Sequence, residues 1–141
     1  MEQYLEKYVG ELVEVRETKD IINIGSKFPD EYSGSQYTRK TKGARAKAKA
    51  NAVQGIKEMI EIATERQYRD NHKEKHSDDA QKGWYYYLTR FAMPLYNNQV
   101  KTGEYNIYTA CIVVNHASND KLYLYDVVDI KKEAGNPLKA N

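Results

Sequence analysis

The chain has 141 residues, enough for one domain with a single hydrophobic core. Its apolar fraction is 40%, and 13 Tyr against only three Pro disfavour a disordered chain. No apolar run approaches the roughly 20 residues that span a bilayer. The N-terminal residues also lack the basic-then-apolar layout of a signal peptide. We therefore expect a single cytoplasmic domain over residues 1–141 that does not act at a membrane.

Positive charge is concentrated in one segment. Six of the 22 Lys and Arg residues fall between Arg39 and Lys49, where no acidic residue occurs. The rest of the chain holds 16 basic against 20 acidic residues, a net charge of −4. A local basic surface can attract phosphate even though the whole chain carries only +2.

The first 35 residues predict one helix and little other regular structure. Residues 1–17 carry apolar side chains at helical spacing, which predicts a helix: Tyr4, Leu5, Tyr8, Val9 and Leu12. Residues 21–24 are long enough only for a short strand or a turn. Residues 26–35 contain Pro29, Gly34 and three Ser, which is typical of a loop.

From Thr38 onward, Ala residues are interleaved with Lys and Arg, all strong helix formers. At 100° per residue, Lys42, Arg45 and Lys49 line one face, which we expect to face solvent. A thin apolar stripe on another face should pack closely against neighbouring segments of the protein: Ala44, Ala48 and Ala52. Gly55 should break or kink this helix. A second helix, buried along one side, is predicted by the spacing of Ile56, Met59, Ile60 and Ala63.

The second half of the chain predicts a sheet. Residues 67–81 are polar and without periodicity, which indicates a loop or a short connecting strand. Three later runs suit strands, at residues 84–96, 105–115 and 122–130. In the last run one face carries Leu122, Leu124, Val128 and Ile130, and the other carries Tyr123, Tyr125, Val127 and Asp129.

The fold that these elements predict is α+β. Two or three N-terminal helices should pack on a small antiparallel sheet, a meander of three to four strands. One face of the sheet should lie against the helices. The other should carry aromatic and polar groups.

Neither metal chemistry nor thiol chemistry is indicated. His72 and His76 stand four residues apart, but the intervening Glu74 is not in the zinc-protease position and the neighbouring Lys residues repel a cation. We expect a solvated loop there, with no metal or other cofactor. Cys111 is the single cysteine and lies in an apolar run, which is typical of a buried structural thiol.

The basic segment predicts contact with nucleic acid. Its charges lack an acidic partner at i, i+4, so they repel one another unless a polyanion is bound. The alternative is that a Lys-rich face only keeps the domain soluble. The predicted contacts are Arg39, Lys40, Lys42, Arg45, Lys47 and Lys49.

The predicted strands also carry the side chains that metal-independent RNA cleavage requires. Such cleavage needs groups that take a proton from the 2′-hydroxyl, return one to the leaving oxygen and stabilise the charged phosphorane. Suitable residue types lie on or beside the strands: Arg90, His116, Tyr123, Tyr125, Lys131, Lys132 and Glu133. Each taken alone also suits packing or a structural ion pair.

Several segments resemble, in order, a domain of the large polyvalent proteins that phages and conjugative elements encode. They are residues 47–55 (KAKANAVQG), 75–76 (KH) with 83–85 (GWY), 89–94 (TRFAMP), 121–126 (KLYLYD), 130–133 (IKKE) and 136–138 (NPL). That domain is similar to the barnase, EndoU, colicin D and RelE-like nuclease group. The resemblance covers about residues 20–138. It implies helices before a small antiparallel sheet, an RNA substrate and ribonuclease activity without a metal.

The resemblance also implies roles for particular residues. The catalytic positions that it implies are His76, Arg90, His116, Tyr125 and Lys132, with Glu133 as a candidate base. The chain departs from the family's pattern where Tyr86, Leu88 and Asn115 replace polar or basic residues. It departs again where Ala134 and Gly135 stand in place of hydroxyl residues.

The lost polar groups favour an alternative, a catalytically inert binding module of a mobile element. Such a module would act as an anti-defence inhibitor, for example an anti-CRISPR. Its partner would be a host ribonucleoprotein or a host defence protein.

Overall fold

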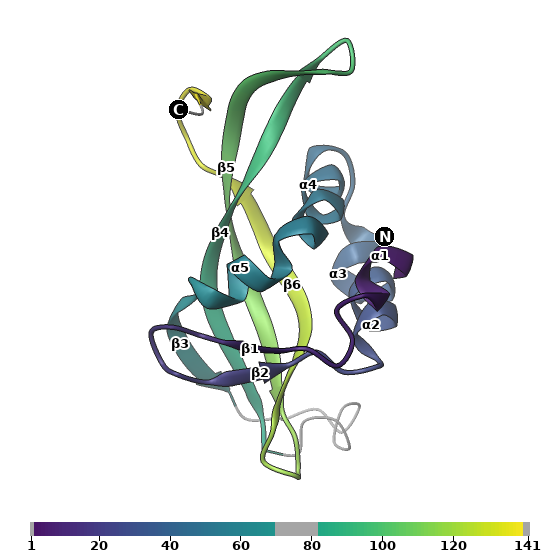
Figure 1. Cartoon of the computed structure of the whole chain (residues 1–141), viewed down its shortest axis with the longest axis vertical. Helices are drawn as coiled ribbons and strands as arrows, with labels where there is room; N and C mark the ends of the chain where they lie inside the picture. The colour runs from purple at the N-terminus through teal and green to yellow at the C-terminus, as the bar shows by residue number, and fades with distance from the viewer. Residues whose placement is uncertain (1, 70–81, 140–141) are drawn as a thin grey trace.

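The computed structural model describes residues 2–69 and 82–139 and has an α+β fold (Figure 1). Short helices precede and flank a sheet that, in the described residues, has seven strands in a mixed, mostly antiparallel arrangement. The elements in chain order are α1 (Glu2–Glu6), β1 (Leu12–Glu14), β2 (Ile21–Asn23), α2 (Phe28–Gly34), α3 (Gln36–Lys40), α4 (Ala44–Ala52), the 3₁₀ turn η1 (Val53–Gly55), α5 (Ile56–Glu61), β3 (Thr64–Arg69), β4 (Trp84–Asn97), β5 (Val100–His116), β6 (Leu122–Lys132) and β7 (Leu138–Lys139).

The strand order is β1-β2-β6-β5-β4-β3, with β7 paired to β5. The long strands β4, β5 and β6 form the predicted antiparallel meander. The prediction of only three or four strands was wrong, because β1 and β2 extend the sheet through a parallel pairing of β2 with β6, and β3 adds the other edge. β1 and β2 have three residues each, too few to show a periodicity. β3 is almost wholly exposed, so it lacks the alternation of a half-buried strand.

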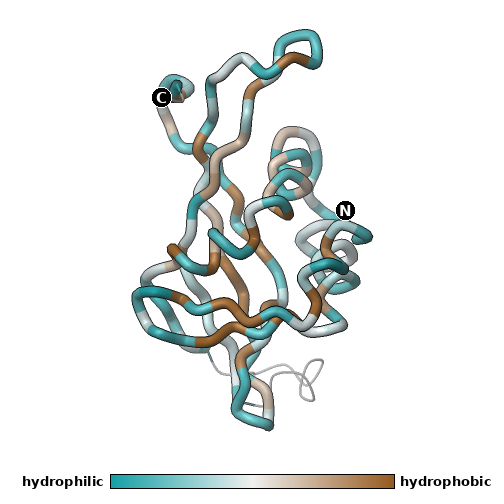
Figure 2. The backbone as a smooth tube through the Cα atoms, in the orientation of Figure 1, coloured by the Kyte–Doolittle hydropathy of each residue, from teal (hydrophilic) through white to brown (hydrophobic). Residues whose placement is uncertain are grey.

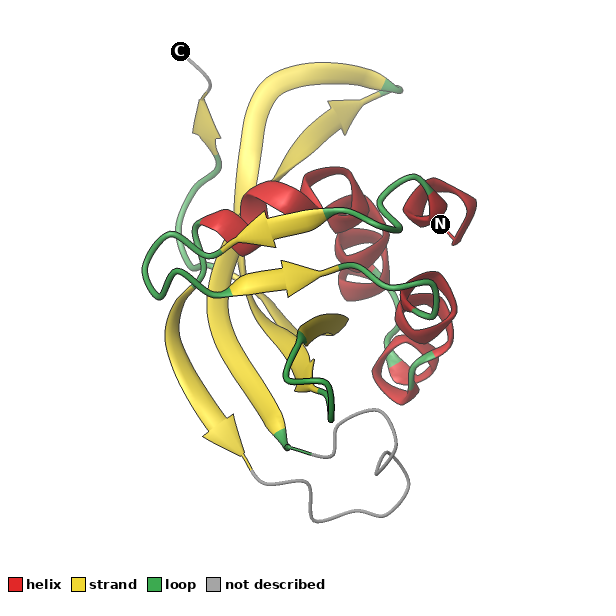
Figure 3. Ribbon diagram, turned by 60° about the horizontal axis from the view of Figure 1, so that its bottom comes forward, coloured by secondary structure: helices red, strands yellow, loops and turns green. Residues whose placement is uncertain are grey.

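The helices lie on one face of the sheet, here called the inner face (Figure 3). The buried residues of α4 and α5 meet those of the central strands in one core, which includes Ala48, Ala52, Ile56, Met59, Ile60, Ile112, Val114 and Leu124. In Figure 2, hydrophobic stretches run through β1, β2 and α5, whereas the turn between β1 and β2 is hydrophilic. The predicted helix at residue 56 and the break at Gly55 are confirmed, since η1 separates α4 from α5.

Two predictions near the N-terminus were wrong. The first helix ends at Glu6, because Gly10 turns the chain at a φ of 94° and the following residues pair as β1. The predicted loop at residues 26–35 contains α2. Pro29 suits the first turn of a helix, and Phe28 and Tyr32, four residues apart, are both buried.

The predicted faces of the last strand hold from Leu122 to Tyr125 and again at Asp129, which is exposed, and Ile130, which is buried. Between them the faces are reversed, because Val127 is buried toward the core and Val128 is only partly buried. The register with β5 shifts between Val113 and Val114 and again between Thr109 and Cys111, and Asp129 has a φ of 52°. Each bulge inserts one extra residue into β6, so the faces of the strand are exchanged after the first bulge and restored after the second.

A buried ion pair joins α4 to β6. The side chains of Lys49 and Asp126 are each only 2% exposed, and the Lys49 Nζ lies 2.5 Å from the Asp126 Oδ1. The ammonium also lies 4.5 Å from the ring centroid of Tyr32 and 5.0 Å from that of Tyr37. Burial raises the pKa of Asp126 and lowers the pKa of Lys49, while the attraction between the two charges acts in the opposite direction.

The prediction that Lys49 faces solvent and contacts nucleic acid was therefore wrong. Helical periodicity placed Lys49 with Lys42 and Arg45, but its carboxylate partner lies 77 residues further along the chain. In the same helix Ala48 and Ala52 are buried as predicted, whereas Ala44 begins the helix and is exposed.

Replacement of Lys49 by Met should lower the free energy of unfolding by about 3–5 kcal/mol, because it leaves the Asp126 carboxylate buried without its cation. The double variant Lys49→Met, Asp126→Leu should recover most of this loss, because no unpaired charge remains. Urea unfolding at pH 7 measures both. The control is Lys47→Met on the same helix, an exposed position where a change of at most about 0.5 kcal/mol is expected. Equal losses at positions 47 and 49 would contradict the pairing.

A second polar contact fixes the β1–β2 turn to the inner face. The Tyr87 hydroxyl donates to Asp20 Oδ2 at 2.7 Å, and Arg66 and Thr18 donate to the same carboxylate. Burial acts to raise the pKa of Asp20, but the hydrogen bonds from Thr18, Tyr87 and Arg66 outweigh it and lower that pKa. This carboxylate therefore stabilises the fold above its ordinary pKa of 3.8, and the stabilisation is lost as the pH falls below that value.

Replacement of Tyr87 by Phe should cost about 1.5–3 kcal/mol at pH 7, where the hydroxyl donates to an ionised carboxylate. The cost should shrink below pH 3, where Asp20 takes up a proton. Urea unfolding at the two pH values tests this. Tyr85→Phe is the matched control, because none of the hydrogen bonds among the described residues involves its hydroxyl. A cost of Tyr87→Phe that is the same at both pH values would contradict the assignment.

Candidate nucleic-acid interface

The exposed cations of α3 and α4 form the first half of the candidate interface. Ser35 caps α3 by accepting the Thr38 N–H at 3.1 Å, and Gly43, at a φ of 66°, turns the chain into α4. Five of the six predicted contacts are exposed, and no ion pair within residues 2–69 and 82–139 involves them: Arg39, Lys40, Lys42, Arg45 and Lys47.

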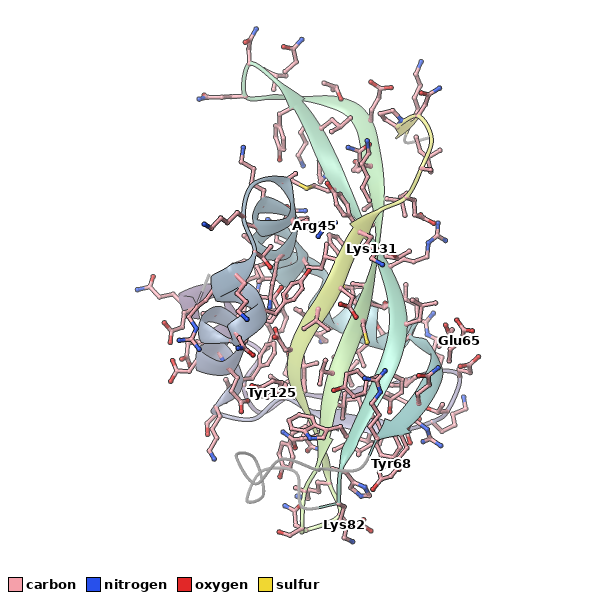
Figure 4. All side chains as sticks on the ribbon, turned by 180° about the vertical axis from the view of Figure 1, so that it is seen from behind. Arg45, Glu65, Tyr68, Lys82, Tyr125 and Lys131 are labelled. Atoms are coloured by element: carbon pink, nitrogen blue, oxygen red, sulfur yellow. The ribbon has the colours of Figure 1, made fainter. Side chains whose placement is uncertain are left out.

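Two cations at the end of β6 continue this surface. The Tyr37 hydroxyl on α3 accepts the backbone N–H of Ile130 at 2.9 Å, which holds α3 beside the C-terminal end of β6. Lys131 and Lys132 follow directly, and both are exposed. In Figure 4, Arg45 and Lys131 lie at a similar height along β6. The end of β6 has β5 on one side and no described strand on the other, so Lys131 and Lys132 point to opposite faces at an edge of the sheet. We give the name basic surface to the exposed cations of residues 39–47 together with those of this edge: Arg39, Lys40, Lys42, Arg45, Lys47, Lys131 and Lys132.

The outer face of the sheet carries aromatic and polar groups, as predicted. Figure 4 shows β4, β5 and β6 in front of the helices, and no described helix covers this face. The Trp84 ring lies 5.1 Å from the Tyr125 ring in an edge-to-face contact. The Arg69 guanidinium lies 4.3 Å from the centroid of the Tyr86 ring. Aromatic rings and guanidinium planes are the groups on which unpaired bases stack.

The structure does not bring together the predicted catalytic residues that it describes, which are Arg90, His116, Tyr125, Lys132 and Glu133. Arg90 and Glu133 form an ion pair at 2.8 Å and so neutralise each other. The Tyr125 ring contacts Trp84, which stands six residues before Arg90 on β4. Six strand residues span about 20 Å, so Tyr125 lies about that far from the Arg90–Glu133 ion pair. Thr109 on β5 pairs with Arg90 on β4 and with Lys131 on β6, so Arg90 and Lys131 point to the same face of the sheet. Lys132, the next residue, therefore points to the opposite face. His76 lies outside the described residues.

His116 is the one described candidate that has acid–base partners. Its Nε2 lies 2.7 Å from Asp120 Oδ1, and the Lys82 Nζ lies 3.0 Å from the same oxygen. The Tyr85 ring is 5.6 Å from the imidazole. Hydrogen bonds from Lys82, the larger effect, and from His116 lower the pKa of Asp120, so it is ionised at neutral pH. We call this group the His116 cluster; a carboxylate that orients an imidazole beside a cation can support proton transfer at a phosphate.

The sequence analysis missed Lys82 and Asp120. The β5–β6 turn brings Asp120 back to His116, with its own φ at 71° and its N–H bonded to the Ala117 carbonyl. Lys82 lies beside Asp120 and His116 because its backbone N–H donates to the His116 carbonyl. The spacing of His116 and Asp120 across a turn was visible in the sequence, but the approach of Lys82 depends on the pairing of β4 with β5.

Cys111 is not a candidate nucleophile. Its side chain is half-buried on β5, and burial, followed by the nearby Asp129 carboxylate, raises the pKa of the thiol to about 11. At neutral pH the thiolate, which is the reactive form, is therefore scarce.

Neither a metal cluster nor a membrane-spanning helix occurs in the described part of the chain. No three His, Cys, Asp or Glu side chains among those residues are grouped so that they could hold a metal ion. None of the described helices is long and apolar enough to cross a bilayer.

Comparison of the chain with protein-family models, with curated proteins and with solved structures finds no match in any of the three. The resemblance to the nuclease group of mobile elements stays a prediction.

Proposed function

We propose that this protein is an RNA-binding module of a mobile genetic element and that the basic surface contacts the RNA phosphates. The observation that carries the proposal is the set of seven exposed cations that α3, α4 and β6 bring together, none of which has an ion-pair partner among the described residues. The five like charges within residues 39–47 repel one another, and phosphates would relieve that repulsion. The remainder of the chain is net acidic, so attraction of a polyanion would be confined to this surface.

The dispersal of the candidate catalytic residues supports binding over cleavage. Arg90 is held by Glu133, and Tyr125 lies in an aromatic pair about 20 Å away. A site for phosphoryl transfer needs its acid, base and charge-stabilising groups within hydrogen-bond reach of one phosphate. The aromatic outer face adds support, because it offers stacking surfaces for bases. An anti-defence role against a host ribonucleoprotein rests on the resemblance alone and stays a prediction.

RNA cleavage is a second candidate function, and the His116 cluster favours it. The imidazole is oriented by Asp120, and Lys82 places a positive charge within 3.0 Å of that carboxylate. One imidazole could abstract the 2′-hydroxyl proton while the lysine stabilises the charged phosphate.

The variant Lys42→Gln, Arg45→Gln, Lys47→Gln should bind single-stranded RNA with a weaker dependence on salt. Each phosphate contact on a single strand contributes about 0.7 to the slope of log affinity against log salt, so the slope should fall by about 2. Fluorescence anisotropy with a labelled oligonucleotide from 50 to 300 mM salt measures it. Thermal stability should be nearly unchanged, because the three side chains are exposed.

The control is Lys19→Gln, Lys101→Gln, Lys139→Gln, which removes three exposed charges outside the basic surface. Its salt slope should stay close to that of the wild type. An equal fall of the salt slope in both triple variants would mean that RNA binding depends only on the net charge of the protein. An unchanged slope in the Lys42, Arg45, Lys47 variant would mean that these cations only keep the domain soluble.

If the His116 cluster cleaves RNA, the wild type should degrade transfer RNA and total RNA in EDTA, and His116→Ala should be slower by at least about 100-fold. A gel assay with end-labelled RNA measures the rate. An all-2′-deoxy oligonucleotide of the same sequence is the control substrate, since it lacks the attacking hydroxyl. Absence of cleavage by the wild type, or equal rates for both proteins, removes this candidate and leaves the binding function standing.

A further inference from the structure

Planar side chains stand in two neighbouring rows on the outer face of the sheet. Tyr87 is buried in the core, and because strand residues alternate between faces, Trp84 and Tyr86 point to the outer face. Trp84 pairs with Arg69 on β3, and Tyr86 pairs with Gln67. The two rows are about 6.8 Å apart along the strands. Trp84, Tyr86 and Arg69 therefore lie close together at one end of this face.

Arg69 is held over an aromatic ring and is also accessible to solvent. Its guanidinium lies 4.3 Å from the centroid of the Tyr86 ring, within the range of a cation–π contact. The residue is exposed, and no ion pair among the described residues involves it. An arginine in this position presents both a positive charge and a planar group to a ligand.

Trp84 adds a second ring beside this arginine. Its side chain is partly exposed and meets Tyr125 edge to face, with the ring centroids 5.1 Å apart. No described helix covers this face of the sheet (Figure 4). An aromatic surface next to a cation fits a ligand that joins planar rings to anions. Nucleic acid has that chemistry, and an unpaired base is the one whose ring face is open for stacking.

The outer face also leads from these rings to a cation of the basic surface. Arg90 and Lys131 both pair with Thr109, so Lys131 points to the outer face, as Trp84 does. Six strand residues separate Trp84 from Arg90, a distance of about 20 Å. Glu133 neutralises Arg90, so Lys131 supplies the positive charge at that end. A single strand of about 4–16 nucleotides, the usual length for such surfaces, can cover both ends.

We propose that Arg69, Tyr86 and Trp84 form a stacking site for unpaired bases of the RNA whose phosphates contact the basic surface. The inference rests on the RNA-binding function argued above and adds a substrate class to it, single-stranded rather than duplex RNA. The bases stack on the two rings and on the guanidinium, and the strand crosses the outer face toward Lys131. Bases inside a duplex are stacked on their neighbours and cannot reach these groups.

The test compares one 12-nucleotide RNA as a single strand and as a duplex with its complement, by fluorescence anisotropy at one salt concentration. The wild type should bind the single strand more tightly by at least about 10-fold, within the range that stacked bases supply. Trp84 is the only tryptophan of the chain, so its emission reports on the stacking site directly. Saturation with the single strand should quench that emission, and the duplex should leave it nearly unchanged.

Arg69→Lys keeps the charge and removes the planar group. It should weaken binding of the single strand by about 5- to 150-fold, the effect of losing one stacked base, without changing the salt slope or duplex binding. Because Arg69 is exposed, this variant should fold as the wild type does. Tyr86→Leu should weaken single-strand binding by a similar factor. The matched controls are Arg16→Lys and Tyr96→Leu, exposed residues of the same types outside both surfaces, which should keep the wild-type preference.

Equal affinity of the wild type for single strand and duplex, without quenching, overturns this inference and leaves RNA binding by the basic surface in place. A preference for the single strand that survives in both Arg69→Lys and Tyr86→Leu overturns it as well. So does a wild-type dimer that Tyr86→Leu dissociates in analytical ultracentrifugation, because a second copy of the chain would then cover this face. Failure of the wild type to bind either form of RNA overturns both this inference and the proposed function.

Discussion

The buried pair of Lys49 and Asp126 is the contact on which the arrangement of the helices depends. It links α4 to β6 at a point where both side chains are only 2% exposed, and the Tyr32 hydroxyl on α2 donates to the Lys49 carbonyl at 2.6 Å. A lysine ammonium is costly to bury, so its position is restricted to the place where the carboxylate lies. Three helices and a central strand are thereby held in one orientation.

This constraint also decides which charges reach solvent. With Lys49 turned toward β6, the rest of the basic segment is left on the outside of α3 and α4, and the Tyr37 hydroxyl holds α3 beside Ile130. Cations from residues 39–47 then lie on the helices, and those at the end of β6 lie at the neighbouring edge of the sheet. The buried lysine serves stability and orientation, and the exposed cations are those that we propose contact RNA phosphates. The uniform composition of the segment does not separate its buried lysine from its exposed ones.

The parts of the fold that were predicted correctly depend on local patterns. The spacing of Ile56, Met59 and Ile60 indicated α5, and the three aliphatic and aromatic runs indicated β4, β5 and β6. The errors arose where a local pattern is short or misleading. β1 and β2 acquire their strand conformation by pairing with each other and with β6, and the bulges in β6 follow from its register with β5.

The candidate sites, like the fold, were predictable only where a local sequence pattern defines them. The sequence by itself determined that a dense cluster of positive charge lies on a helical segment and that the sheet has an aromatic face, because both follow from residue type and spacing. Only the tertiary structure decided that Lys49 is buried, that Lys131 and Lys132 lie beside α3, and that Asp120 and Lys82 meet His116. The physical reason is that burial and pairing depend on partners far away in the chain, such as the carboxylate 77 residues from Lys49.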